Sequence, residues 1–224
     1  MTPIEIRRLG LITVGTALTC ALAGCGGASE SENGGATAGP PKSSAREDVP
    51  AGANTITICY EDTDWAQRIF TEAGDPDPDA SAINSEYATF YHEVGHMAIS
   101  VYDLPVTGRE EDVADQLAAY VLLTPGEDGR TDPESVQAVK DFARAFGASG
   151  AERYELDAAD FADEHSLDET RMYNLECWIY GSNPEANRDL VADGQLPEDR
   201  ASGCQEEWAQ LDQAWSTLLD PYFK

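Results

Sequence analysis

Basic residues are scarce in this chain of 224 residues. Lysine and arginine together number 14, against 42 aspartates and glutamates, so the formal net charge is -28 at pH 7. A surface this negative repels phosphate backbones and anionic lipid headgroups, which argues against nucleic-acid binding and against electrostatic docking to a membrane. The charge is typical of a well-solvated surface and is compatible with cationic partners, but it identifies no substrate.

The sequence also lacks an apolar run long enough to cross a bilayer comfortably. The stretch from Leu9 to Leu22 follows two arginines and is shorter than the roughly 20 residues that a span needs. It ends in Leu-Ala-Gly-Cys, which resembles the lipobox of bacterial lipoproteins. We therefore predict that residues 1–24 are a signal peptide and that lipid on Cys25 anchors the protein to the cell membrane, outside the cytoplasm. An ordinary secretory signal is the alternative, and the paired arginines leave the export route (Sec or twin-arginine) open.

Cysteine is rare as well. Apart from Cys20 in the predicted signal and the lipidated Cys25, the chain contains Cys59, Cys177 and Cys204. Disulfides persist outside the cytoplasmic membrane, and two of these three cysteines lie in the C-terminal region. We therefore expect a bridge between Cys177 and Cys204, which would leave Cys59 as a buried, reduced thiol.

Large apolar residues are almost missing between the signal and the folded part. Residues 25–50 consist mainly of Gly, Ser, Ala, Glu and Pro, a composition that cannot bury enough surface to offset the entropy of ordering. They predict a disordered tether, followed by a single domain over residues 51–224. Within the domain, Asn54 to Tyr60 alternates isoleucine with threonine and predicts a strand.

The remainder of the domain predicts helices. They are expected over Asp64 to Glu72, Asn84 to Tyr102, Glu110 to Leu123, Asp132 to Gly147, and from a Ser166/Glu169 capping box to Gly181, with two more beginning near Pro184 and Pro197. We therefore predict a mostly α, α+β fold, in which a pair of helices lies beside a small β-sheet and the C-terminal part is helical.

Histidine occurs only three times, and two of the three lie in the sequence HEVGH. His92 and His96 are one helical turn apart, so both imidazoles leave the same face and can bind one ion. A catalytic zinc site has three protein ligands and keeps a position open for water. We therefore predict zinc as the cofactor, with Glu93 as the base that takes a proton from the water.

The next predicted helix offers a third ligand. Glu111 and Asp115 lie one turn apart in GREEDVADQLA and share a face, so Glu111 can bind the metal while Asp115 hydrogen-bonds the far nitrogen of a histidine ligand. Glu110 and Asp112 are expected to point elsewhere.

Several phrases together resemble a bacterial family of putative metallopeptidases, domain of unknown function 4344. They are ITICYE, HEVGH, LPVTGREEDVADQLA, DEHSLDETRMYNLECWIYGSNP and the run from LPEDRASGC to WSTLLDP. The resemblance implies a zinc-peptidase-like fold with His92, Glu93 and His96 as motif residues. The ExxAD form of Glu111 to Asp115 is similar to gluzincin peptidases. Neither resemblance implies a particular peptide or protein substrate, and the oligomeric state stays unknown.

Two hypotheses follow from the motif. The first is a zinc metalloendopeptidase in which His165, surrounded by acidic residues, donates a hydrogen bond to the oxyanion of the tetrahedral intermediate. His165 could equally be a solvated residue before a helix cap, with Tyr173, Tyr180 or Arg171 as the donor instead. The second hypothesis is a lipid-anchored binding or assembly protein that keeps the zincin-like fold without turnover. Glu93 separates the two, because a structural metal site needs no base.

Overall fold

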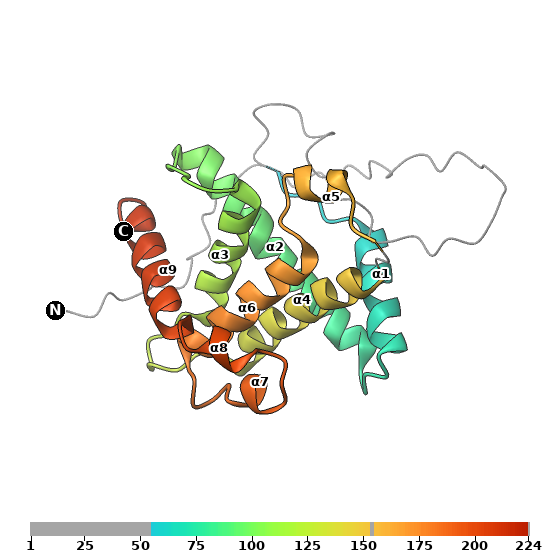
Figure 1. Cartoon of the computed structure of the whole chain (residues 1–224). Coiled ribbons are helices and arrows are strands. Elements are labelled where there is room, and N and C mark those ends of the chain that lie inside the picture. Colours follow the sequence, from blue (N-terminus) through green and yellow to red (C-terminus); the bar gives the residue numbers. More distant parts are fainter. Residues whose placement is uncertain (1–54, 153–154, 224) are drawn as a thin grey trace.

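The computed structural model describes residues 55–152 and 155–223, so the predicted signal peptide, Cys25 and the tether lie outside the described residues. Within these ranges all regular structure is helical (Figure 1). The helices are α1 (Tyr60–Glu72), α2 (Pro78–Tyr102), α3 (Glu110–Leu123), α4 (Pro133–Ala151), α5 (Ala158–Ala162), α6 (Asp168–Ser182), α7 (Asp189–Ala192), α8 (Glu198–Ala201) and α9 (Cys204–Leu219). No helix in the described part is long and apolar enough to cross a membrane.

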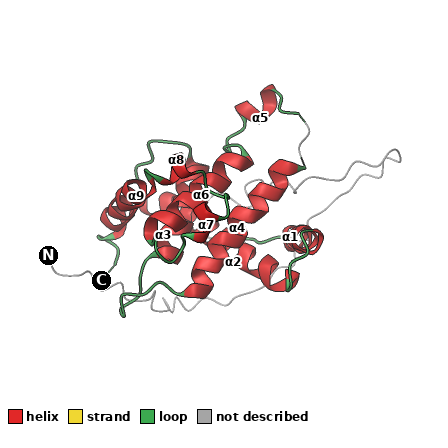
Figure 2. Ribbon diagram, turned by 60° about the horizontal axis from the view of Figure 1, so that its bottom comes forward, coloured by secondary structure: helices red, strands yellow, loops and turns green. Residues whose placement is uncertain are grey.

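The predicted β-sheet is wrong for the part of the chain that the structure describes, which contains no strand (Figure 2). Residues 55–59 have no regular structure, and the chain turns directly into α1 at Tyr60. Alternation of isoleucine and threonine is a local preference, whereas a strand also needs a neighbour whose backbone groups complete the ladder. Helices occupy the described chain beyond this segment, so no such neighbour is present there.

The predicted helices α1, α2 and α4 extend beyond their expected limits, and α1 starts at Tyr60 instead of Asp64. α2 starts at Pro78, earlier than predicted, because the side chain of Asp77 caps it by accepting a hydrogen bond from the amide of Ala80 and proline is tolerated in the first turn. α4 continues past Gly147 to Ala151. A Cβ atom on Gly147 would lie 2.7 Å from Sδ of Met172, so this glycine permits close packing of α4 on α6 instead of ending the helix.

The start of α6 also differs from the prediction. Leu167 occupies the N-cap position, and the hydroxyl of Ser166 donates instead to Oδ2 of Asp112 on α3, at 2.9 Å. The capping box that the structure contains belongs to α5, where Asp157 and Asp160 satisfy each other's backbone amides.

The core lies where α2, α3, α4 and α6 pack together, with α1 at one side of the molecule and α9 at the other (Figure 1, Figure 2). Its fully buried side chains include Leu117, Leu175, Ile179 and Trp215. The predicted disulfide between Cys177 and Cys204 is present and joins α6 to α9. Cys59 is half-buried and lies outside this bridge.

Candidate metal centre

The helix pair α2 and α3 brings the predicted metal ligands together. His92 and His96 lie one turn apart on α2, and Glu111 lies in the first turn of α3. The two helices approach closely because Gly95 has no side chain: a Cβ atom there would lie 2.8 Å from Cα of Ala114. Both histidines therefore face the start of α3.

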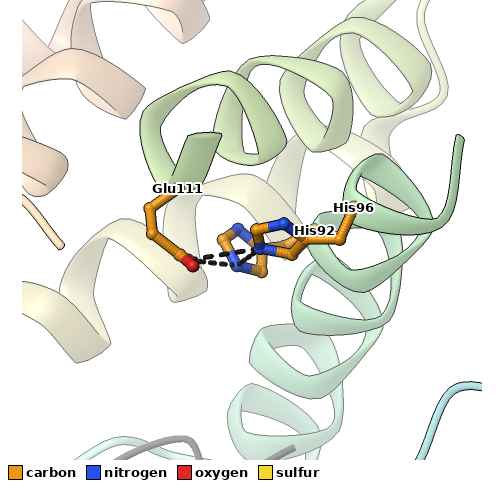
Figure 3. Close-up of side chains that lie close together, drawn as sticks. All are labelled: His92, His96 and Glu111. Atoms are coloured by element: carbon orange, nitrogen blue, oxygen red, sulfur yellow. Dashed lines mark hydrogen bonds and ion pairs between the residues drawn. The ribbon is translucent and has the colours of Figure 1, made fainter. Parts of the chain in front are cut away.

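Three donor atoms converge between these helices (Figure 3). Nε2 of His92 and Nε2 of His96 are 3.2 Å apart, and each lies 3.2 Å from Oε2 of Glu111. Two imidazole nitrogens and one carboxylate oxygen are the donor set of a catalytic zinc site with an open position. His92 and Glu111 are buried, and His96 is half-buried.

Carboxylates fix the far nitrogen of both histidines. Nδ1 of His92 lies 2.8 Å from Oδ1 of Asp115, and Nδ1 of His96 lies 2.9 Å from Oε1 of Glu110. Each Nδ1 therefore carries the proton and donates it to a carboxylate, which leaves the lone pair of Nε2 directed at the shared centre. The donor set and its tautomers fit a zinc ion.

Asp115 in turn is held by Arg171, which reaches it from α6. Nε and one terminal nitrogen of Arg171 donate to the two carboxylate oxygens of Asp115, both at 2.7 Å. Burial by itself would raise the pKa of Asp115, but the charge of Arg171 and the hydrogen bonds from His92 and Arg171 outweigh it and lower the pKa to about 2. The guanidinium also lies 3.9 Å from the ring centre of Phe146.

The charges at the centre reinforce one another. Burial opposes protonation of His92, but hydrogen bonds to Asp115 and Glu111 raise its pKa to about 9. Burial likewise opposes ionisation of Glu111, yet hydrogen bonds from His165, His92 and His96 hold the pKa of its carboxyl well below the usual range. The site is thus an ionised carboxylate surrounded by imidazoles, and a metal cation would replace protons on this set.

His165 approaches the same carboxylate from the loop that precedes α6. Its Nε2 lies 3.2 Å from Oε2 of Glu111, and its Nδ1 lies 2.8 Å from Oδ1 of Asp163. The Arg109 side chain donates to the backbone carbonyls of Asp163 and His165, which ties this loop to the start of α3. The hydrogen bond to Glu111 raises the pKa of His165 despite its partial burial, with Asp163 contributing in the same direction.

The other predicted residues are placed as follows. Glu93 is half-buried on α2, about 100° around the helix from His92. Among the alternative donors, Arg171 is committed to Asp115, Tyr180 packs against the core, and Tyr173 lines a separate cavity beside α1.

Two residues of the centre were missed by sequence reasoning. Glu110 was expected to point away, but it contacts His96, and Arg171 was considered only as an oxyanion donor. Three consecutive acidic residues open α3, and which of them faces α2 depends on how the helices cross. No local sequence signal identifies the partner of an arginine that is 56 residues distant from it.

Comparison with known proteins is consistent with this geometry. The model of the family DUF4344, described as "Putative metallopeptidase", matches residues 50–219. Neither the curated proteins nor the solved structures provided a match. The match covers most of the chain and includes every residue of the centre described above. The chain therefore belongs to the DUF4344 family of putative metallopeptidases.

Proposed function

We propose that this protein is a zinc-dependent metalloendopeptidase that hydrolyses peptide bonds at the bacterial cell surface. One observation carries the proposal: Nε2 of His92, Nε2 of His96 and Oε2 of Glu111 converge, while carboxylates hold both Nδ1 atoms. Three protein ligands of this kind are typical of catalytic zinc sites rather than of structural ones, which supports the proposal. Membership of the family supports the same class of activity.

His92, His96 and Glu111 would hold the zinc ion, and Asp115 and Glu110 would orient the two imidazoles. When bound, zinc supplies a Lewis acid that polarises the scissile carbonyl and acidifies a water molecule. Arg171 keeps Asp115 ionised and fixed in place, so the tautomer of His92 is set before any ligand arrives.

Glu93 acts as the proton carrier. It neighbours His92 in the chain and lies on the same turn of α2, and it is not one of the three converging ligands. It takes a proton from the attacking water and delivers it to the nitrogen of the leaving amine.

His165 stabilises the oxyanion. Its Nε2 points at the centre, and Asp163 hydrogen-bonds its Nδ1, an arrangement that favours a protonated ring with Nε2–H as a donor. Once Glu111 binds metal, this N–H is available to a carbonyl oxygen that develops negative charge beside it.

Metal analysis together with a peptide-cleavage screen tests the proposal. The purified chain should contain one zinc ion, and the separate variants His92→Ala, His96→Ala and Glu111→Ala should each lose it. Glu185→Gln, an exposed change of charge in the turn after α6, is the matched control. If all three ligand variants kept the zinc content of the parent, the site would be assigned wrongly. If the parent bound zinc but cleaved no peptide in a broad library, the non-catalytic binding protein would be the better description.

A further inference from the structure

A cavity of about 440 Å³ opens between α1, α4 and α6. Its walls include the apolar side chains of Ile69, Phe70 and Met172, and no residue of the metal centre contributes to them. The volume is within the range of small-molecule sites, about 300 to 1,000 Å³. The cavity is therefore large enough for a small ligand and is separate from the metal centre.

A buried carboxyl group without a partner lies in the wall of this cavity. Glu176 is 6% exposed, and its Oε2 atom is shielded from solvent and makes no hydrogen bond. Buried polar atoms are nearly always paired, and an unpaired carboxylate is costly. Burial raises the pKa of Glu176 to about 7, which reflects the same lack of compensation.

The arginine in the cavity wall does not compensate Glu176. Arg144 also lines the cavity, but its guanidinium donates to Asp75 and Asp141 and lies over the ring of Phe70. The cavity thus combines apolar walls, one uncompensated acid and an arginine that is already paired. A ligand that complements it has a cationic, hydrogen-bond-donating end and an apolar body.

We propose that this cavity is a binding site for a small alkylamine, in which the ammonium group donates to Glu176 and the hydrocarbon chain packs on Ile69, Phe70 and Met172. This inference goes beyond the proposed peptidase activity and does not depend on it.

Calorimetric titration of the full chain with three probes of equal length tests the site. Hexylamine should bind one to one with a dissociation constant of about 1 mM or lower. 1-Hexanol, which keeps the chain without the charge, and hexanoate, which reverses the charge, should bind at least about tenfold more weakly. Equal binding of all three probes would show an apolar cavity without selection by Glu176 and would overturn the proposal.

Variants locate the binding. Glu176→Gln should weaken hexylamine about tenfold or more, whereas the exposed Glu185→Gln should not change it. Ala148→Phe should block the cavity while leaving the acid in place. His92→Ala should bind hexylamine as the parent does, which excludes coordination of the amine by the metal. Failure of the parent to bind hexylamine, or equal binding by the parent and Glu176→Gln, would overturn the proposal. If Ala148→Phe does not fold, Glu176→Gln still tests the site, because it removes the charge and adds no bulk.

Discussion

Arg171 on α6 donates two hydrogen bonds of 2.7 Å to Asp115 on α3, and both side chains are almost fully buried, at 7% and 2% exposure. Asp115 in turn accepts the Nδ1 proton of His92. The metal centre is therefore supported from a helix that supplies no metal ligand. Such outer partners typically change metal affinity by about 10- to 100-fold.

Arg171→Met should weaken zinc affinity by about this factor, because Asp115 would lose the cation that keeps it ionised and oriented. Arg171→Lys keeps the charge but not the two-pronged contact, so we expect an intermediate affinity. Competition with a chelator of known affinity measures both variants, and the exposed Arg130→Met is the control. A folded Arg171→Met protein with the parent's zinc affinity would refute the supporting role.

Glu93→Gln should retain one zinc ion and the parent fold but lose turnover by about 10²- to 10⁴-fold, since glutamine is nearly isosteric and cannot accept the proton. Peptide hydrolysis by the zinc-loaded variant measures this loss. Glu61→Gln, an exposed change in the first turn of α1, should keep full activity. An active Gln variant would eliminate Glu93 as the base.

His165→Ala should lose about 10²- to 10³-fold in turnover while binding zinc normally, the usual effect of removing one oxyanion donor. Asp163→Asn, which removes the charge beside Nδ1, should cause a smaller loss. Tyr173→Phe is the comparison, because Tyr173 lines the alkylamine cavity rather than the centre. Unchanged kcat in His165→Ala would mean that His165 only packs against Glu111.

Glu176→Gln should change how stability depends on pH. The folded pKa of Glu176 is about 7, above its usual value of 4.5, so the folded state binds the proton more tightly than the unfolded state. As pH rises from about 4.5 to 7, the parent should therefore lose on the order of 2 to 3 kcal/mol more stability than the variant does. Urea unfolding of both proteins at pH 4.5 and pH 8 measures this difference.

Comparing the parent with Glu176→Gln separates the effect of Glu176 on stability from that of a second acid, Glu86. Burial and the neighbouring Asp62 carboxyl raise the pKa of Glu86 to about 8, so Glu86 also titrates in the pH range of the experiment. That contribution is common to both proteins and cancels. A stability difference that stays constant between the two pH values would show that Glu176 ionises normally.

Cys25→Ala should release the protein from the membrane fraction, since the lipid on Cys25 is the only anchor that we propose. Cell fractionation followed by mass analysis of the N-terminal peptide measures both location and acylation. The change Cys59→Ala is the matched control, because Cys59 lies in the folded domain. Retention of the Cys25→Ala protein on membranes would require another anchor.

The features that the sequence determined by itself are those set by local spacing. Two histidines four residues apart share a helix face because an α-helix turns every 3.6 residues, and the same rule pairs Glu111 with Asp115. Proline and aspartate likewise mark the start of α4, because their effects operate within one turn. The family resemblance, carried by several such phrases, was confirmed over residues 50–219.

The tertiary structure decided everything that depends on partners distant in the chain. The alternating segment at residues 55–59 has a strand's pattern but no neighbouring strand within the described chain, so the predicted sheet is absent there. Glu110 faces His96 because Gly95 lets α3 approach α2 at close range and so fixes the rotation of α3. The packing of α6 on α3 and α4 buries Arg171 and Glu176 alike. Arg171 finds a partner in Asp115, whereas Oε2 of Glu176 is left unpaired in the cavity wall.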